Sequence, residues 1–140
     1  MNKQRGFLLI EVLIAVVIIT IAVTAAASLL MQSVKSNISA GKYTVAASLA
    51  QKQLEYLKSR STAVAWNQLT IPETGEVKLG ADWQSEANNT VLLNNTTYTL
   101  ASLASKCPED SADLVQIRVV VAWSRNSDDN IEMTAVFSKR

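Results

Sequence analysis

The fold of this chain is decided by residues 5–34, which read RGFLLIEVLIAVVIITIAVTAAASLLMQSV. Between Arg5 and Lys35, Glu11 is the only charged residue. A helix of about 20 apolar residues spans the hydrocarbon core of a bilayer. A carboxylate in such a helix is costly unless it is paired, so an ionisable residue there is by default a functional residue. We therefore expect a membrane-spanning helix in which Glu11 has a role of its own.

Three other interpretations of this segment explain less. A plain membrane anchor accounts for its length but gives no reason for Glu11. A secretory signal peptide could be cut at the small residues Ala25-Ala26-Ala27, but its apolar core would exceed the usual length of about 7–15 residues. A core helix of a soluble protein would have to be buried on every side, and a chain of 140 residues is too short for that.

The N-terminal pattern resembles a known family. A short basic head with Lys3 and Arg5 is followed by GFLLIEVLIA, residues 6–15. This pattern is similar to the class III signal of type IV prepilins, the N-terminal methylation motif of pilins and pseudopilins. The resemblance implies that prepilin peptidase cuts after Gly6 and removes the leader peptide, residues 1–6. It also implies that the same enzyme N-methylates the new N-terminal residue, Phe7, and that Glu11 is the family's hallmark glutamate.

Partners and location follow from the same resemblance. The positive head is expected to stay in the cytoplasm, because basic residues flank membrane spans on that side. The protein would then be a single-pass protein of the cytoplasmic (inner) membrane, and later part of a pilus or of a periplasmic or extracellular filament. Expected partners are the prepilin peptidase/methyltransferase, other pilin or pseudopilin subunits, and an inner-membrane assembly platform.

A physical role for Glu11 fits this picture. In a filament of packed helices, Glu11 of one subunit would lie near the charged N-terminus of another. A buried charge that loses its partner costs far more than a pair that never formed. Glu11 could therefore select the axial stagger in which it is paired.

One continuous helix is predicted from Phe7 to Arg60, 54 residues without proline and with Gly41 as the only glycine. Its length would be about 80 Å at 1.5 Å per residue. Residues 7–34 form the transmembrane and assembly half. Thr20, Thr24 and Ser28 recur there every four residues on one face, where small and hydroxyl residues favour close helix packing and hydrogen bonds between helices.

Residues 35–60 form the amphipathic half. Its apolar stripe is predicted to dock on the C-terminal domain: Val34, Ile38, Val45, Leu49, Leu54 and Leu57, with Ala46 and Ala50 beside it. Gly41 lowers local helix stability by about 1 kcal/mol and could mark a bend. Residues 46–55, AASLAQKQLE, are more weakly similar to a stretch of V-type minor pilins and I-type minor pseudopilins.

Residues 61–140 predict a small antiparallel β-sheet, so the fold class is α+β. Short strands are expected at residues 76–79, 90–93 and 97–103, with a turn at Asn94-Asn95-Thr96. The strongest strand, residues 114–124, alternates between an apolar face and a face that carries Gln116 and Arg118. A second hairpin pairs it with residues 131–137. The sheet is expected to pack on the amphipathic half of the helix, as in pilins. The apolar face of the strongest strand comprises Val115, Ile117, Val119, Val121 and Trp123.

Residues for catalysis are scarce, and no enzyme activity, cofactor or metal is expected. The chain has no histidine, the commonest general base and metal ligand. Cys107 is the only cysteine, so it forms no disulfide within the chain and has no histidine to activate it. Two acidic clusters, Glu109-Asp110 with Asp113 and Asp128-Asp129-Asn130, lack EF-hand spacing. Trp66, Trp83 and Trp123 are expected to pack in the core or on a strand face.

The net charge argues against nucleic acid as a direct partner. The chain has 13 basic and 12 acidic residues, a formal net charge of +1. Removal of residues 1–6 would take away Lys3 and Arg5 and leave 11 basic against 12 acidic residues, a net charge of −1. Nucleic-acid binding would require a basic stripe.

The predicted function is that of a structural subunit, a minor pilin of a type IV pilus. The first alternative is a minor pseudopilin of a type II secretion or DNA-uptake (competence) system, which shares the same filament physics. A second alternative, from a different class, is a membrane-anchored binding module outside any filament, for which Glu11→Ala would be harmless. An enzyme is a third class, which would require activity that depends on Cys107 or an acidic cluster.

Overall fold

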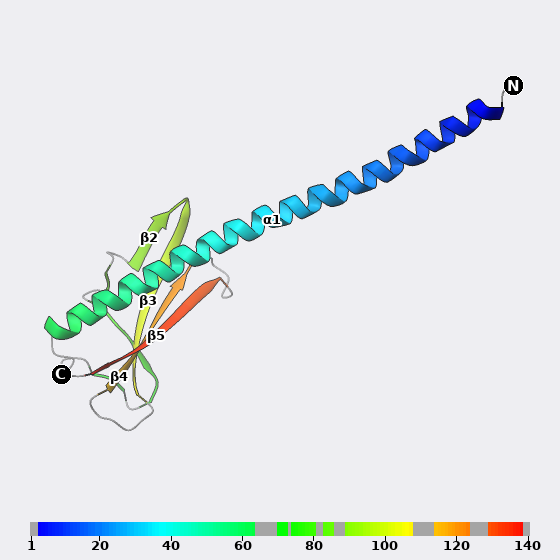
Figure 1. Ribbon diagram of the computed structural model, residues 1–140. Helices are drawn as coiled ribbons and strands as arrows, with labels where there is room; N and C mark the ends of the chain where they lie inside the picture. The colour runs from blue at the N-terminus through cyan, green and yellow to red at the C-terminus, as the bar shows by residue number, and fades with distance from the viewer. Residues whose placement is uncertain are drawn as a thin grey trace. The chain divides into compact units, whose positions relative to one another are not determined.

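The computed structural model describes residues 3–63, 70–72, 74–80, 83–85, 89–107, 114–123 and 129–138, and within the helix the side chains of residues 9–60. It contains one helix, α1 (Lys3–Ala63), and five strands (Figure 1). The chain divides into two compact units, Met1–Gly41 and Lys42–Arg140, and each is described by itself below. The arrangement is α+β and pilin-like, as the sequence predicted.

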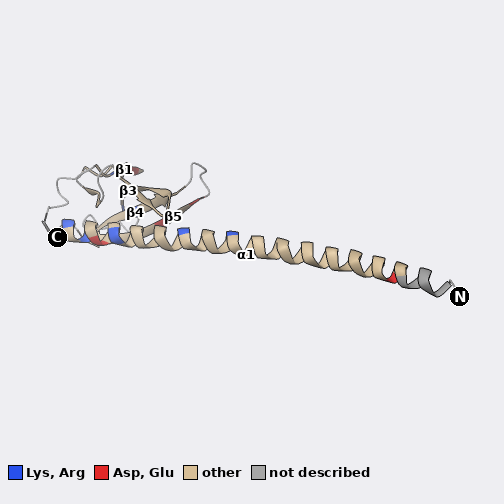
Figure 2. Ribbon diagram, turned by 90° about the horizontal axis from the view of Figure 1, so that it is seen from above, with Lys and Arg blue, Asp and Glu red and all other residues tan. Residues whose placement is uncertain are grey.

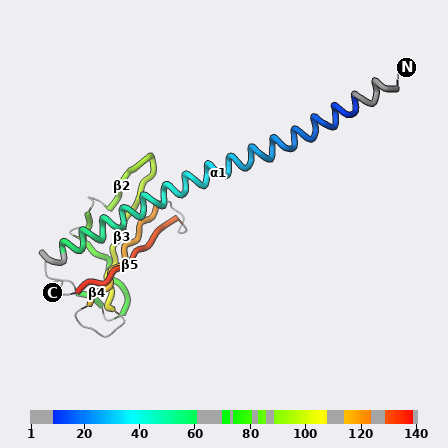
Figure 3. The backbone as a smooth tube through the Cα atoms, in the orientation of Figure 1, coloured from blue at the N-terminus to red at the C-terminus, as the bar shows by residue number. Residues whose placement is uncertain are grey.

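The helix α1 is continuous, and the coloured part of its backbone trace in Figure 3 runs without a break. No proline interrupts it, so beyond the first turn each backbone amide can donate to the carbonyl four residues earlier. The helical backbone runs through Gly41 without interruption and ends at Ala63, three residues beyond the predicted Arg60. A Cβ at Gly41 would meet nothing within 4 Å, so this glycine is not required by close packing.

The sheet is antiparallel, with the strand order β1-β3-β4-β5 and with β2 paired to β3. The strands β3 and β5 are longer than predicted, whereas β4 ends at Ala122, two residues before the predicted end at Ser124. The predicted third turn residue, Thr96, is the first residue of β3. The strands are β1 (Glu76–Lys78), β2 (Thr90–Leu93), β3 (Thr96–Lys106), β4 (Leu114–Ala122) and β5 (Asn130–Ser138).

The turn between β2 and β3 explains the sharp hairpin. Asn94 and Asn95 have φ angles of 48° and 58°, the left-handed region that asparagine tolerates better than most residues. Two central residues with positive φ define the type I′ turn, whose twist matches that of the strands it joins. The sequence predicted this turn correctly at both asparagines.

The core of the second unit lies between the sheet and the helix residues that follow Gly41. On β4 the predicted alternation is confirmed, because Val115, Ile117, Val119 and Val121 are fully buried and the residues between them are half-buried. On β3 the buried residues are Tyr98, Leu100, Ser102 and Ala104. Burial raises the pKa of the Tyr98 phenol.

The buried face of the helix differs from the predicted stripe. It starts at Ala46 and repeats at helical spacing, whereas Val34 and Ile38 are 56% and 57% exposed. Ala46 and Ala50, expected beside the stripe, are its most buried members at 0% exposed. Small side chains at these positions let the backbones of helix and sheet come close. The buried helix residues are Ala46, Leu49, Ala50, Gln53 and Leu57.

Candidate assembly segment

The first unit presents apolar side chains on every side. Sixteen large apolar residues between residues 9 and 38 are 49–70% exposed. Within the described residues, one helix, Leu9–Arg60, is long and apolar enough to cross a membrane, and an 18-residue window of it has a mean hydropathy of 2.7. A helix that is hydrophobic all round belongs in a lipid or protein environment. This unit is therefore the part of the molecule that requires lipid or neighbouring helices around it.

Glu11 lies in this unit and is exposed. It has no hydrogen-bond or ion-pair partner among the side chains that the structure describes. Figure 2 shows an acidic position near the N-terminal end of α1, followed by a long uncharged stretch before the next basic position. The pairing of Glu11 with the N-terminus of a neighbouring subunit stays a prediction. Gly6 and Phe7 lie in the helical backbone of α1, and the side chain of Phe7 is outside the described ones.

The three hydroxyl residues on one face donate hydrogen bonds within their own helix. Thr20 Oγ1 donates to the carbonyl of Val16 at 2.8 Å, and Ser28 Oγ donates to that of Thr24 at 2.9 Å. Thr24 Oγ1 reaches two carbonyls, those of Thr20 and Ile21, at 3.0 and 2.9 Å. The hydroxyl protons of these residues are thus already hydrogen-bonded, so this face can contact lipid or another apolar helix without burying an unpaired hydroxyl donor.

In the second unit, Gln53 forms a buried polar contact that the sequence reasoning missed. Its Nε2 donates to the carbonyl of Trp83 at 2.8 Å and to Ser102 Oγ at 3.0 Å, and its Oε1 accepts from the amide of Ser85 at 2.8 Å. Gln53 is 0% exposed. It therefore connects α1 to β3 and to the segment before β2, with both the nitrogen and the oxygen of its carboxamide hydrogen-bonded.

A second glutamine extends this network. Ser102 Oγ donates to Gln84 Oε1 at 3.3 Å, and Gln84 Nε2 donates to the carbonyl of Leu79 at 3.4 Å. The signal for Gln53 was available, because it lies four residues after Leu49 and four before Leu57, on the buried face. Sequence reasoning passed over it because glutamine is usually exposed.

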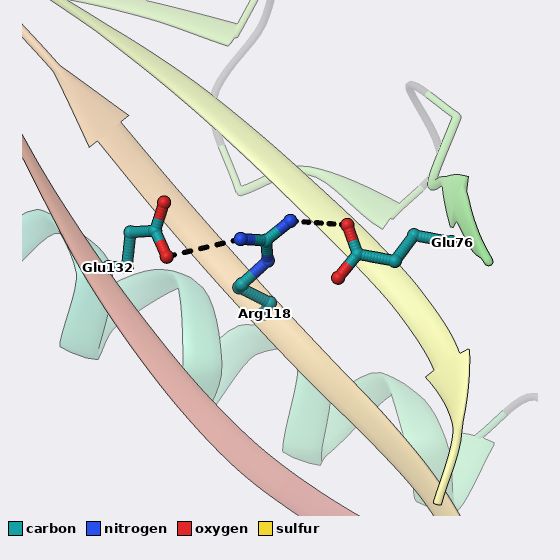
Figure 4. A network of polar contacts seen from close by, with 3 residues as sticks. All are labelled: Glu76, Arg118 and Glu132. Carbon is teal, nitrogen blue, oxygen red and sulfur yellow. Dashed lines mark hydrogen bonds and ion pairs between the residues drawn. The ribbon is translucent and has the colours of Figure 1, made fainter. Parts of the chain in front are cut away.

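On the opposite face of the sheet, Arg118 joins three strands (Figure 4). From β4 its guanidinium donates to Glu76 on β1 and to Glu132 on β5, the latter at 3.2 Å. Hydrogen bonds to Glu76 and then to Glu132 raise the pKa of Arg118. The prediction that Arg118 points away from the core is confirmed. Because all three side chains are partly exposed, this cluster is a surface brace, and its net charge is negative.

The other candidate residues do not gather into a site. Cys107 is a free, half-buried thiol at the end of β3. No group of three potential metal-ligating residues occurs among the described residues. The first acidic cluster, residues 109–113, and Asp128 fall outside them, as does Trp66. Trp123 is 8% exposed and packs edge-on against Tyr43, with ring centroids 4.7 Å apart, so its predicted packing role is confirmed.

Comparison with known proteins identifies the N-terminal segment. Residues 1–27 match the family model described as the prokaryotic N-terminal methylation motif. The match contains Gly6, Phe7 and Glu11, together with most of the apolar run. No curated protein and no solved structure matches the chain. The matched motif and the fold of the second unit are independent observations, since one lies in residues 1–27 and the other in residues 42–140.

Proposed function

We propose that this chain is a minor pilin, a structural subunit of a type IV pilus, because its residues 1–27 match the prokaryotic N-terminal methylation motif. Pilin-motif proteins are structural subunits rather than enzymes. The observation that carries the proposal is one apolar segment that is long enough to span a bilayer and whose only carboxylate is the fifth residue after Gly6. The weaker similarity of residues 46–55 to minor subunits supports the choice of a minor pilin over a major one.

The proposal assigns a part to each segment of the chain. Residues 1–6 are the leader, removed after Gly6 by prepilin peptidase, and the same enzyme methylates Phe7. Residues 7–34 anchor the subunit in the inner membrane and then assemble in the filament. Residues 35–60 carry the sheet domain, residues 61–140. Because the cut leaves the apolar segment attached to the domain, the processed subunit stays in the membrane until an assembly platform extracts it.

Glu11 is the assembly residue in this proposal. It is exposed and has no partner among the described side chains, yet it sits in a segment that requires an apolar environment. The N-terminal amine of Phe7 exists only after cleavage, and it supplies the opposite charge in a neighbouring subunit. Pairing offsets the cost of burying either charge alone. Processing is thereby a precondition of correct assembly.

A minor pseudopilin of a secretion or DNA-uptake system is the alternative within the same class. It would use the same signal, helix and glutamate, and residues 46–55 resemble both groups. An experiment that distinguishes the two is to crosslink the full chain in cells and to identify the assembly platform that co-purifies with it.

The first experiment determines the mature N-terminus by mass spectrometry. We expect a chain that begins with N-methylated Phe7 in wild type, an uncut chain in Gly6→Val, and normal processing in Gly41→Ala. Gly41 is the matched control because it is a helix glycine with open space around its Cα. A wild-type chain that starts at Met1, or one cut after Ala27, would contradict the proposal.

The second experiment tests assembly through Glu11. We expect Glu11→Gln to reduce the amount of the subunit in sheared filaments about tenfold or more, while its amount in the membrane fraction stays at the wild-type level. Glu55→Gln is the control, because it removes an exposed carboxylate from the same helix in the part that belongs to the second unit. Normal incorporation of Glu11→Gln would contradict the assembly role of Glu11, and absence of the wild-type subunit from sheared filaments would favour an anchored binding module that never joins a filament.

A further inference from the structure

Two exposed leucines beside the turn between β2 and β3 have no role in the proposed function. Leu92 is 69% exposed and Leu93 is 40% exposed, and they directly precede the type I′ turn at Asn94-Asn95. Among the described strands, the only other exposed large apolar residue is Val136 on β5. Exposed apolar residues that occur singly need no explanation, whereas grouped ones mark a contact surface. We call residues 92–95 the hairpin tip.

The hairpin tip lies at the end of the second unit at which the chain enters this unit. Asn95 lines one cleft together with Lys42, and Lys42 is the first residue of the unit. Val136 lies toward the other end of the sheet, in register with Ser105 of β3. Nine residues of β3 separate Ser105 from Thr96 at the turn, which is about 30 Å at about 3.3 Å per residue. The grouped leucines are thus at the entry end and the single valine is far from it.

The length of the connecting chain keeps the entry end close to the membrane. The membrane-spanning half is expected to end at residue 34, and Lys42 follows eight residues later. Eight residues rise about 12 Å in a helix and reach about 28 Å at most when fully extended, whatever the orientation of the two units. The headgroup layer is about 5–8 Å deep on each side of the hydrocarbon core, and helix tilt brings the entry end closer to it. The hairpin tip is therefore within reach of the headgroups.

The charge of the entry end suits an anionic lipid surface. Between Glu11 and Glu55, α1 has no carboxylate, and Lys35 and Lys42 are its first two lysines there. Residues 90–99 of the hairpin are uncharged. Of the described carboxylates, Asp129 is the one next to this end of β5, so the two lysines leave a net positive charge. Basic residues beside apolar ones are typical of segments that lie in the interface of an anionic bilayer.

We propose that the hairpin tip contacts the surface of the bilayer in which residues 7–34 are anchored, before the subunit enters a filament. Leu92 and Leu93 insert among the lipid headgroups, where their apolar side chains leave water. Lys42 faces the phosphates of anionic lipid. This inference rests on the membrane anchoring in the proposed function. It adds a second attachment to the membrane, which holds the sheet of the anchored subunit in one orientation.

The test measures lipid contact at single sites of the full-length protein, in nanodiscs with one copy per disc. In a Cys107→Ser background, the fluorophore NBD is attached at Thr97→Cys, an exposed site that pairs with Leu92, or at Ser138→Cys, an exposed site at the other end of the sheet. The discs contain phosphatidylcholine and phosphatidylglycerol, with a nitroxide on the acyl chain near the headgroup. We expect the nitroxide to quench the Thr97 label at least about threefold more than the Ser138 label, because interfacial segments bury their apolar side chains only at the headgroup boundary.

Variants separate the apolar contact from the charge. Leu92→Ser with Leu93→Ser, and Leu92→Ser alone, are expected to lower the quenching of the Thr97 label, the pair by about threefold or more because both apolar contacts are lost. Val136→Ser removes an exposed apolar residue from the other end of the sheet and is expected to leave quenching unchanged.

Lys42→Gln is expected to abolish the increase in quenching that added phosphatidylglycerol produces, whereas Lys78→Gln, an exposed lysine on β1, should retain it. Circular dichroism of each variant verifies that the sheet is retained.

Several results would overturn the proposal. They are equal quenching of the two labels, undiminished quenching in the leucine variants, and the same lipid dependence in the two lysine variants. Quenching-free protection of the Thr97 label that occurs only in discs with two copies would show that the tip contacts a second copy of the chain instead.

The failure of this inference is distinguishable from that of the proposed function. Co-elution of the protein with the discs is measured first, and a chain that does not co-elute would contradict the membrane anchoring itself. A chain that co-elutes but is not quenched at Thr97 would overturn the lipid contact of the hairpin tip alone.

Discussion

Two parts of one helix are stabilised in different ways. Residues 9–41 have large apolar side chains exposed all round and no tertiary core. Residues 42–60 bury one face, with Ala46, Ala50 and Leu57 at 0% exposed, and leave the other face charged or polar. The first part depends on an apolar medium, in which a helix satisfies all its backbone groups internally. The second depends on a sheet that the chain itself supplies.

The difference teaches that apolar content alone does not mark the buried surface of a helix. Val34 and Ile38 are exposed, whereas two alanines and a glutamine lie in the core. In the second part, position on the helical circumference decides burial, and the residue type follows from the space available. In the first part, most residues up to Val34 are apolar, and the proposed role of Glu11 depends on its position among them.

The largest expected effect contrasts a leucine from each part. Leu57→Ala should destabilise the sheet unit by about 2–5 kcal/mol, because a fully buried leucine is lost and a cavity remains. Leu13→Ala, from a site that is 58% exposed, should change it by less than about 0.5 kcal/mol. Denaturant unfolding of the full chain in micelles, followed by tryptophan fluorescence, measures both. Similar losses would break the distinction between the two parts.

A smaller effect is expected from the buried glutamine. Gln53→Ala should cost about 1–3 kcal/mol, because the amide of Ser85 and the carbonyl of Trp83 lose their partner in the interior. Gln51→Ala, at an exposed helix position, is the control and should be nearly neutral. The same unfolding measurement applies. A neutral Gln53→Ala would mean that the network adds little to the docking of helix and sheet.

The surface brace should contribute less than the buried network. Arg118→Gln is expected to lower stability only slightly, since its partners Glu76 and Glu132 remain solvated. The difference from wild type should shrink as salt is raised to about 1 M, because ions screen exposed charges. Unfolding curves at low and high salt provide the measurement. A loss as large as that of Gln53→Ala, insensitive to salt, would contradict the assignment as a surface brace.

The smallest effect is expected in the membrane part. Thr24→Val should alter filament incorporation little, by less than about 0.6 kcal/mol of packing energy, because the hydroxyl of Thr24 donates within its own helix and average interhelical polar contacts are worth about that amount. Quantitative detection of the variant in sheared filaments measures it, with Ser48→Val as a control in the second unit. A severe loss would mean that Thr24 bonds to a neighbouring helix.

Much of the fold was predictable from local pattern. The long helix follows from the absence of proline, the type I′ turn from Asn94-Asn95, and the inward face of β4 from strict alternation. The strand ends were less predictable, because they depend on where partners stop. The pairing of Glu76 with Arg118 joins residues 42 apart in the sequence, which no local pattern shows.

The candidate functional residues also fall into two groups, those expected from local sequence and those that depend on tertiary contacts. The roles of Gly6, Phe7 and Glu11 were expected from the resemblance to the prepilin motif, which is a local pattern of one charge within an apolar run, and they stay predictions. Gln53 was missed, because its hydrogen-bond partners Trp83, Ser85 and Ser102 come from segments distant in sequence.

By itself the sequence determined the membrane-length helix, its signal and the alternation of the strands, because helix propensity, apolar run length and period-2 patterning are local properties. The tertiary structure decided which face of the helix is buried, which glutamine is satisfied inside, and which strands pair with β3. These depend on strand register and on close contact between distant segments, where volume and hydrogen-bond geometry, not residue type, set the outcome.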